Sequence, residues 1–413
     1  MSRPRKTGEP GALVIGSAYK RLGVVRSLGR QGIRVWVLRD DHALATWSRY
    51  AERSLPWPAS GEGEQVSYLL TLARRYALDG WVLFPGDDET AALLARNSDR
   101  LGETYRVSVL TPWARLRSAY DKRLTYRLAA EVGVDHPRTR YPGGREDVLA
   151  YDGGFPAILK PATRAEPNRF TTAKAWPADD LATLVARYDE ACTLVERSLV
   201  MIQEVIPGDG RDQLSYAALC DDGEPVVSLV ARRLRQWPAD FGRASTYVET
   251  IDDPEVEATA GRLLAALHFD GLVEVEFKRD RRDGRLKLLD VNPRIWGWHT
   301  LGRRAGVDFP YLLWRMLNGA PVSPARGRPG VRWVRALTDV PTVLGALRAG
   351  ELSFPAYLSS LRGPIEYAVL ARDDPLPAIV ELPSALHLAW VRRGQTEASV
   401  SPAVVSPSEA RSR

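Results

Sequence analysis

Hydrophobic and polar positions alternate most regularly between residues 272 and 292, and the pattern there predicts a β-hairpin. Apolar and acidic residues alternate along the segment LVEVEFK at 272–278. This period of two is typical of a strand. An Asp-Gly pair at 283–284 predicts a tight turn. The segment LKLLDVN at 286–292 follows as the second strand, so we expect the hairpin to gather polar side chains on one face.

The polar residues of this hairpin indicate a cation site. Counting outward from the turn places Glu276 opposite Asp290, to within one residue, and Asn292 lies on the same face as Asp290. Facing carboxylates repel each other unless a cation lies between them, and carboxylate and amide oxygens suit Mg²⁺ bound together with phosphates. Arg294 is predicted to hold a phosphate or an oxyanion. The alternative is an exposed acidic hairpin with a solvated face.

The N-terminal part of the chain has the strand–helix–strand pattern of a doubly wound sheet. Apolar strands are predicted at 12–15, 33–38 and 81–85, with helices between them. The glycines after the first strand lack the G-x-G-x-x-G spacing, so no dinucleotide cofactor is predicted. The polar segment 86–90 begins another helix. Either its Asp and Thr side chains cap that helix, or the helix start binds an anionic substrate.

A lysine near the end of an apolar strand is notable in a chain whose basic residues are mostly arginine. After one predicted helix at 112–133, the strand at 155–161 contains Lys160 and leads into a polar loop at 162–172. One interpretation is that Lys160 lies at the edge of the strand and extends its ammonium group into solvent. The other is that Lys160, next to the polar loop, binds phosphates. A further helix is predicted at 177–190.

A basic run continues the next predicted strand. The segments 216–219 and 226–230 form an antiparallel pair across an Asp-Asp-Gly turn, and the run at 231–236 extends the second of them. Strand alternation predicts that Arg233 and Arg235 share a face, where they would hold a phosphate tail or a substrate carboxylate. The alternative is a basic strand that contacts only solvent.

Composition narrows the class of protein. The chain has 413 residues, 45% hydrophobic and 26% charged, which is typical of a soluble protein of several domains. Two cysteines, Cys192 and Cys220, exclude a disulfide scaffold and a structural zinc site and fit a cytoplasmic location. The net charge of +6 is scattered, so no nucleic-acid partner is predicted. No apolar segment is long enough to span a membrane, and the N-terminus lacks the apolar core of a signal peptide.

The order of the motifs resembles the ATP-grasp superfamily. The segments ILKP at 158–161, QEVIPG at 203–208, VEVEF at 273–277 and LLDVNPR at 288–294 follow one another as they do in that superfamily, and the likeness covers residues 12–320. Within it the chain looks like the predicted carboxylate–amine ligases, relatives of biotin carboxylase and D-alanine–D-alanine ligase. It departs from the usual pattern in having Asp at 290, where Glu is commoner, and no glycine in the loop after Lys160.

The resemblance implies a multidomain fold of α/β and α+β class: a Rossmann-like domain, then a two-lobed ATP-grasp domain, then a C-terminal extension. The implied bounds are 1–111 for the first domain, 112–322 for the ATP-grasp domain with lobes at 112–198 and 199–322, and 323–394 for the extension. A Ser-, Pro- and Arg-rich tail at 395–413 is expected to be disordered.

The resemblance also implies an activity. A ligase of this family uses ATP and Mg²⁺, with Mn²⁺ as a substitute, to convert a small carboxylate into an acyl phosphate, which an amine then attacks with release of phosphate. Carried over position by position, the implied residues are Arg294, Arg235 and Lys160 for catalysis, Lys122, Lys160, Gln203, Glu204, Ile206 and Asp209 for ATP, and Glu276, Asp290 and Asn292 for the metal ion.

Two other functions remain open at this stage. The first is an ATP-dependent carboxylase that forms carboxyphosphate, and the second is an ATP-binding regulatory protein without turnover. The expected partners are a small carboxylate and an amine, and a homodimer is common among related folds. The sequence does not name either substrate.

Overall fold

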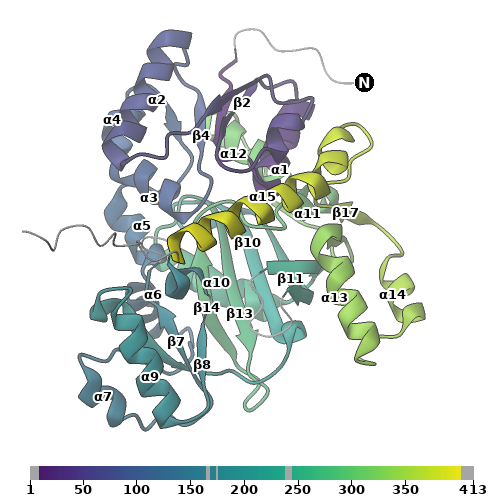
Figure 1. Cartoon of the computed structure of the whole chain (residues 1–413). Coiled ribbons are helices and arrows are strands. Elements are labelled where there is room, and N and C mark those ends of the chain that lie inside the picture. Colours follow the sequence, from purple (N-terminus) through teal and green to yellow (C-terminus); the bar gives the residue numbers. More distant parts are fainter. Residues whose placement is uncertain (1–8, 164–167, 174, 238–243, 401–413) are drawn as a thin grey trace, which may run out of the picture.

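The computed structural model describes residues 9–163, 168–173, 175–237 and 244–400. Helices pack on three β-sheets in this part of the chain (Figure 1). The strand orders are β3-β2-β1-β4-β5, β6-β9-β7-β8 and β14-β13-β10-β11-β12-β16-β17, with β15 beside β11. Within the described ranges, none of the helices has the length and apolar character needed to cross a bilayer.

The first sheet is parallel, as the N-terminal pattern predicted. Its strands are β1 (Ala12–Ile15), β2 (Val35–Arg39), β3 (Arg53–Pro56), β4 (Val82–Phe84) and β5 (Arg106–Val107), and its helices are α1 (Tyr19–Arg30), α2 (Glu62–Tyr76), α3 (Asp88–Arg96) and α4 (Ser98–Gly102). Alternate residues of β1 pack against different helices: Leu13 joins a cluster with α2 and α3, and Val14 joins one with α1. Helices therefore cover both faces, and the direction of winding reverses between the neighbours β1 and β4.

The segment 86–90 caps a helix, which was one of the two roles predicted for it. Asp87 accepts a hydrogen bond from the backbone N–H of Thr90, and the Thr90 hydroxyl accepts one from the backbone of Asp87. This capping box satisfies two free N–H groups at the start of α3. It also fixes the direction of Asp88, the first residue of that helix.

The second sheet is a four-stranded antiparallel lobe. It consists of β6 (Thr139–Arg140), β7 (Ala157–Pro161), β8 (Trp176–Ala178) and β9 (Val200–Glu204), with α7 (Arg145–Leu149), α8 (Arg169–Thr172) and α9 (Leu181–Cys192). The helix predicted at 177–190 begins later than expected. Asp180 caps α9 through the N–H of Thr183, and the residues before it pair with β7 as a strand.

The single helix predicted at 112–133 is two helices, α5 (Trp113–Tyr120) and α6 (Lys122–Glu131). The break occurs at Asp121, whose backbone is extended and whose buried side chain accepts a hydrogen bond from the N–H of Arg123. An aspartate competes with the helix backbone in this way and favours a cap over a helix interior. The break makes Lys122 the first residue of α6, which contacts β14.

The third sheet has eight strands and carries the hairpin at one edge. Its strands are β10 (Gln213–Asp221), β11 (Glu224–Trp237), β12 (Ala244–Ile251), β13 (Gly271–Arg279), β14 (Leu286–Asn292), β15 (Ala325–Arg326), β16 (Arg332–Val334) and β17 (Ile365–Tyr367), and α10 (Pro254–Ala266), α11 (Thr300–Ala305) and α12 (Phe309–Leu317) pack with it. The predicted hairpin and the predicted pair β10–β11 are both confirmed.

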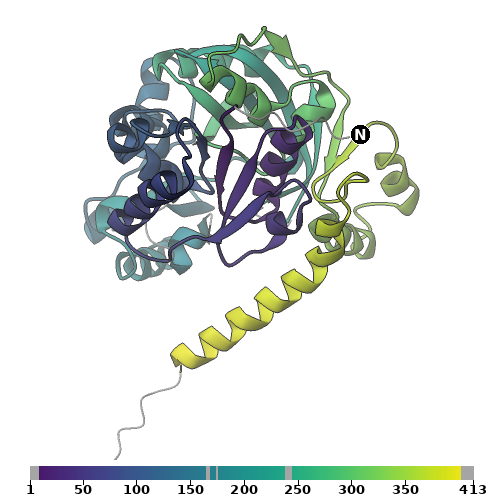
Figure 2. The ribbon, with the colours of Figure 1, turned by 90° about the horizontal axis from the view of Figure 1, so that it is seen from above.

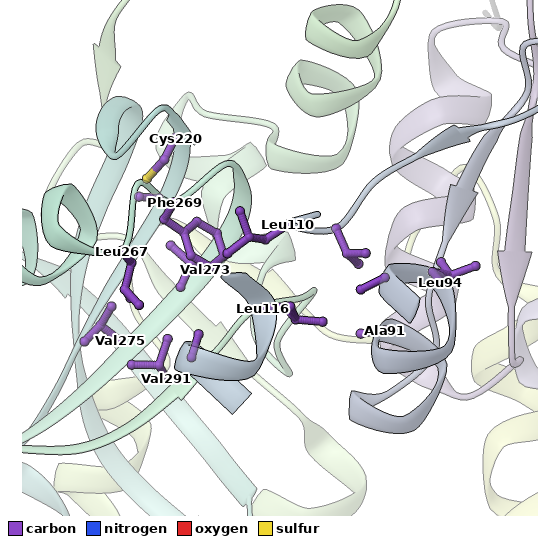
Figure 3. Packing of buried hydrophobic residues seen from close by; sticks show 14 of the residues in the cluster. Ala91, Leu94, Leu110, Leu116, Cys220, Leu267, Phe269, Val273, Val275 and Val291 are labelled. Carbon is purple, nitrogen blue, oxygen red and sulfur yellow. The ribbon is translucent and has the colours of Figure 1, made fainter. Parts of the chain in front are cut away.

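A shared hydrophobic cluster joins the first sheet to the hairpin. It runs from Leu94 of α3 through Leu116 of α5 to Val273 and Val291 of the hairpin, all of them almost fully buried (Figure 3). Such close packing tolerates little relative movement. The cluster therefore holds the carboxyl ends of β1 and β4 in a fixed relation to the hairpin.

The segment after 322 extends the third sheet rather than standing apart from it. β15 pairs with β11, β16 pairs with β12, and β17 pairs with β16. Three helices follow these strands: α13 (Ala336–Arg348), α14 (Phe354–Ser360) and α15 (Leu376–Val400). Figure 2 shows α15 projecting from the body of the molecule. Helix α15 runs to Val400, so it includes the first residues of the tail at 395–413, whose disorder stays a prediction; residues 401–413 lie outside the described residues.

Candidate functional site

The hairpin register brings the predicted metal-binding residues together. Glu276 pairs with Asp290 across the strands, as predicted, and Glu274 pairs with Asn292. The Asn292 amide nitrogen donates to Glu276 Oε1 at 2.9 Å and to Glu274 Oε2 at 3.2 Å. One side-chain amide therefore ties two carboxylates to each other on this face of the sheet.

Two basic residues offset the charge of these carboxylates. Lys122 Nζ lies 2.8 Å from Asp290 Oδ1, and both side chains are mostly buried. Arg233 Nη2 lies 3.3 Å from Glu276 Oε2. The carboxylate pair is therefore flanked by one cation from α6 and one from β11.

A small hollow, partly open to solvent, lies beside the Lys122–Asp290 pair. Its wall includes Asn292 from the hairpin and Asp88 from the start of α3. Residues from the first sheet, from α6 and from the hairpin thus converge on one space. A junction of this kind between structural units is typical of a small-molecule site.

The donor set suits a magnesium ion that also binds ligand oxygens. Among the described residues no group of three His, Cys, Asp or Glu side chains is placed to hold a metal ion. Glu276, Asp290 and the Asn292 amide could supply oxygens, and Mg²⁺ in proteins often takes one or two carboxylates and completes its shell with phosphates and water. Asn292 Oδ1 accepts a hydrogen bond from Arg294, so the amide must turn to present its oxygen to a cation beside Glu276.

Arg294 is bound on all three nitrogens by protein acceptors. Its Nε and Nη2 donate to the two carboxylate oxygens of Asp88 at 2.7 and 2.8 Å. Its Nη1 donates to the backbone oxygen of Ile295 and its Nη2 also to Asn292. Burial favours the neutral guanidine, but the Asp88 carboxylate outweighs it and raises the pKa of Arg294. In this arrangement Arg294 joins the hairpin to α3.

The structure does not bring Arg235 to the hairpin, and the alternation predicted for the basic strand is wrong. The register of β11 against β12 shifts between Arg233 and Arg235, which shows a β-bulge at Leu234. The bulge separates the directions of the two arginines. Arg235 binds both oxygens of Asp339 on α13, at 2.8 and 2.7 Å.

Lys160 is connected to the hairpin through two hydrogen-bonded side chains. Its Nζ donates to Gln203 Oε1 at 3.2 Å, and Gln203 Nε2 donates to the Tyr126 hydroxyl at 3.2 Å. That hydroxyl donates to the backbone oxygen of Leu289 at 2.9 Å, one residue before Asp290. Lys160 and Gln203, predicted as nucleotide-binding residues, are therefore adjacent and lie near the hairpin.

The hairpin also fixes the predicted adenine hinge. Glu204 accepts hydrogen bonds from the Arg138 N–H at 2.8 Å and from Arg282 Nη2 at 2.9 Å. Burial opposes ionisation, but these two donors outweigh it and lower the pKa of Glu204. Lys278 Nζ donates to the backbone oxygen of Ile206 at 2.8 Å. The side chains that position the hinge thus come largely from the hairpin.

Asp209 has a structural partner on each side. It caps the short 3₁₀ helix Gly210–Asp212 through the N–H of Arg211, and it lies 3.1 Å from Arg281 Nη2. Its predicted contact with a ribose stays a prediction. The loop predicted after Lys160 lies partly outside the described residues, and so does Lys174.

Several residues of this site were not predicted from the sequence. The alternation that predicted Glu276 also places Glu274 on the same face, so Glu274 was within reach of the pattern. Glu274 is buried and accepts a hydrogen bond from Trp298 Nε1 at 2.9 Å. The predicted segment 86–90 contains Asp88, but nothing in it indicated Arg294 as a partner, and no local signal pointed to Tyr126, because these partners lie far away in the sequence.

Comparisons with known proteins agree with this geometry. A family model described as "ATP-grasp in the biosynthetic pathway with Ter operon" matches residues 199–339, the segment that contains the hinge and the hairpin. The L-amino acid ligase from Bacillus licheniformis superposes with a TM-score of 0.59 at 14% identity, covering 76% of this chain and 75% of that one. Over residues 199–339 the chain is therefore similar to a family of ATP-grasp proteins. Its ATP-grasp fold, predicted from the order of the motifs, is confirmed.

Two further ATP-grasp proteins show the range of similarity. The biotin carboxylase domain of 2-oxoglutarate carboxylase from Hydrogenobacter thermophilus, a dimer in complex with MgADP, ADP and bicarbonate, superposes with a TM-score of 0.61 at 14% identity and covers 78% of this chain and 74% of that one. The D-aspartate ligase of Enterococcus faecium is 23% identical over 250 residues, 55% of this chain. The match spans 57% of that curated relative's length.

Proposed function

We propose that this protein is an ATP-dependent ligase that activates a small carboxylate as an acyl phosphate and joins it to an amine, with release of ADP and phosphate. The observation that carries the proposal is that Lys122, Asp290 and Asn292 line one hollow, with Glu276 hydrogen-bonded to Asn292. The proteins with similar sequence or structure include a D-aspartate ligase and an L-amino acid ligase, and these names favour an amide product.

The proposal assigns ATP to the region where the second sheet meets the hairpin. Lys122 and Lys160 would bind its phosphates as cations, and the hinge around Gln203, Glu204 and Ile206 would meet the adenine edge. The bonds from Lys278 and Arg282 to this hinge support the assignment, because they hold the backbone in one conformation. Asp209 remains the proposed contact of the ribose.

Magnesium fits the proposed site when it is shared with ATP. Glu276, Asp290 and Asn292 would hold it, with phosphate oxygens completing the shell. It would neutralise charge on the transferring phosphoryl group. Arg294 forms an ion pair with Asp88, and Arg235 forms one with Asp339. Neither arginine is therefore assigned a contact with the phosphoryl group.

The proposed reaction has two steps. An oxygen of the substrate carboxylate bonds to the γ-phosphorus of ATP while the bond to the β-phosphate oxygen breaks, which gives an acyl phosphate and ADP. The amine nitrogen then bonds to the acyl carbon and loses a proton, and phosphate leaves with the oxygen that came from the carboxylate. Lys122 can transfer from Asp290 to a phosphate oxygen, so that its charge opposes the negative charge that develops.

The experiment is ADP release by the purified protein with Mg²⁺ and ATP against a panel of amino acids and small carboxylates, alone and in pairs. The ligase proposal expects ADP only with a carboxylate–amine pair, and an amide product of the summed mass less water. Asp290→Asn, which keeps the shape of the side chain and removes its charge, should be inactive. Hydroxylamine should replace the amine and yield a hydroxamate from the acyl phosphate.

A second function is favoured by one finding, the structural likeness to a biotin carboxylase domain whose complex contains bicarbonate. Carboxyphosphate formation would release ADP with bicarbonate as the only carboxylate. A bicarbonate arm of the panel therefore separates carboxylase from ligase. Tight ATP binding without ADP release in any arm, and without hydroxamate formation, would instead indicate an ATP-binding regulator. A cytoplasmic homodimer completes the proposal, and sedimentation of the purified chain tests the dimer.

A further inference from the structure

We propose that Arg21, rather than Arg294, receives the carboxylate of the small-molecule substrate, at the carboxyl ends of β1 and β4. The inference rests on the ligase function proposed above and deepens it by naming a residue that selects the substrate.

Arg294 offers no open edge to an incoming oxyanion. Asp88 takes the edge formed by its Nε and Nη2, with both distances below 3 Å, and Ile295 takes its Nη1. Both arginines are mostly buried, with 6% of the Arg294 side chain and 12% of the Arg21 side chain exposed, so their partners distinguish them. A substrate carboxylate could bind Arg294 only after displacing Asp88 and breaking a buried ion pair, which is strongly unfavourable.

Arg21 differs from Arg294 in what its guanidinium contacts. Its Nε is shielded from solvent and has no hydrogen-bond partner in the described structure. Its Nη2 lies 3.7 Å from Asp87 Oδ2, which is an ion pair but too long for a hydrogen bond. A buried N–H group without an acceptor costs free energy. The Nε–Nη2 edge of Arg21 therefore lacks the acceptor that a carboxylate would supply.

Two glycines make room for this guanidinium. A Cβ atom at Gly86 would lie 2.6 Å from Arg21 Nη2, and a Cβ atom at Gly16 would lie 3.0 Å from Arg21 Nε. Gly16 directly follows β1 and Gly86 lies two residues after β4, and these two strands are neighbours in the sheet. The winding of the sheet reverses between them, and ligands of doubly wound sheets bind outside the carboxyl ends of the strands at such a point.

The position of Arg21 is unfavourable for a cation without an anionic partner. It is the third residue of α1, where the helix dipole disfavours positive charge. Burial lowers the pKa of Arg21, and the nearby carboxylates of Asp87 and Asp40 offset that effect only in part. A bound carboxylate would relieve each of these costs. A residue that breaks local rules in this way is typical of a functional site.

The charged groups around Arg21 favour an amino acid. The planar edge of an arginine matches a carboxylate in a bidentate geometry. Asp87 lies beside Arg21, and 55% of its side chain is exposed, so it could accept a hydrogen bond from an ammonium group of the same molecule. A phosphate would offer oxygens similar to those of a carboxylate, and the experiment must separate the two.

The first test uses the full chain and the carboxylate–amine pair that supports ADP release. Arg21→Lys keeps the charge and removes the planar edge, and Arg30→Lys makes the same change at the far end of α1, where the arginine binds Asp373. We expect KM for the carboxylate substrate to rise about 10- to 100-fold in Arg21→Lys, with KM for ATP unchanged and Arg30→Lys like the wild type. In Arg21→Ala, added methylguanidinium should restore turnover, which a merely structural role would not produce. A wild-type KM for the carboxylate in Arg21→Lys overturns the inference.

A second test decides the matter if no pair yields ADP, so that failure of the ligase proposal and failure of this inference are distinguishable. Phenylglyoxal modifies arginine, and mass spectrometry reports its extent at Arg21 with an amino-acid mixture or inorganic phosphate present. Protection by amino acids and not by phosphate supports the inference. Equal modification in every arm, or protection by phosphate alone, overturns it.

Discussion

The ammonium nitrogen of Lys122 lies 2.8 Å from Oδ1 of Asp290, so the first residue of α6 is bound to the edge strand β14. Lys122 thereby supplies positive charge to a carboxylate that also belongs to the proposed metal site. The two roles are in competition, because a cation that displaces Lys122 frees it for the phosphates of ATP.

This competition predicts opposite effects of one substitution. Lys122→Met should bind Mn²⁺ more tightly in the absence of nucleotide, because Asp290 loses its competing partner, and should bind ATP more weakly, because a phosphate contact is lost. Each change should be on the order of 10-fold. Titration calorimetry with Mn²⁺ alone and with a non-hydrolysable ATP analogue measures both.

Lys287→Met is the matched control, since Lys287 also lies on β14 but faces Asp135 and Asp283. It should leave both affinities unchanged. If Lys122→Met weakens both ligands together, Lys122 only supports the local fold.

The pair formed by Asp88 and Arg294 predicts a large effect on stability. Because 13% and 6% of the two side chains are exposed, Asp88→Asn leaves a buried guanidinium without its counter-charge and should lower the free energy of unfolding by about 3–5 kcal/mol. Arg294→Met in the same chain should recover part of that loss. Urea unfolding of the two single variants and the double variant measures the coupling, and strictly additive losses would contradict the account.

Period-two alternation predicted the hairpin because the two strands are close in sequence, and it placed Glu276 opposite Asp290 to within one residue. The register shifts by one residue between Phe277 and Glu276, which the turn does not indicate. The same reasoning failed for Arg235, since the bulge at Leu234 depends on the partner strand β12 and not on the basic run itself. It missed the break at Asp121, where a polar side chain inside an otherwise helical pattern acts as a cap.

Contacts between segments far apart in the chain could not be predicted from the sequence. Asp88 and Arg294 are 206 residues apart, and neither the cap at α3 nor the motif around Asn292 indicates the other. The prediction that Arg294 holds a phosphate followed from its place two residues after Asn292 and from the fit of a guanidinium to oxyanions. The unpaired Nε of Arg21 became visible only when the two strand ends were placed side by side.

Removal of the Tyr126 hydroxyl, a single oxygen atom, should affect both the stability of the fold and KM for ATP. Tyr126→Phe leaves the amide of Gln203 and the carbonyl of Leu289 without this bridge, so the unfolding free energy should fall by about 1–3 kcal/mol. KM for ATP should rise, because the strands that carry Lys160 and Asp290 lose a link. Tyr141→Phe, at an exposed tyrosine of the same lobe, should change neither quantity. Unchanged stability and KM in Tyr126→Phe would contradict the link.

Because His299 is buried, we expect the free energy of unfolding to depend on pH. Burial lowers the pKa of His299 to about 4 from its ordinary value of 6.5, and the ring accordingly stays neutral in the folded chain. Between those two values the unfolded chain binds a proton that the folded chain does not, so the unfolding free energy should fall by about 3 kcal/mol as the pH drops from 6.5 to 4. The contribution is complete above pH 6.5.

Unfolding free energies of wild type and His299→Gln across this pH range measure the difference in slope. The variant should show the shallower dependence, while His268→Gln, at an exposed histidine, should follow the wild type. Parallel curves for wild type and His299→Gln would contradict the assigned pKa.

Transfer of oxygen from the carboxylate to the released phosphate tests the central claim most directly. A carboxylate substrate labelled with ¹⁸O on both oxygens is incubated with its amine partner, Mg²⁺, ATP and the wild-type chain, and the phosphate is analysed by mass spectrometry. The acyl phosphate route predicts one ¹⁸O atom in each phosphate released and the other in the amide carbonyl. Phosphate that carries no label, with its fourth oxygen drawn from water, would mean that ATP is hydrolysed without activating the carboxylate and would contradict the ligase account.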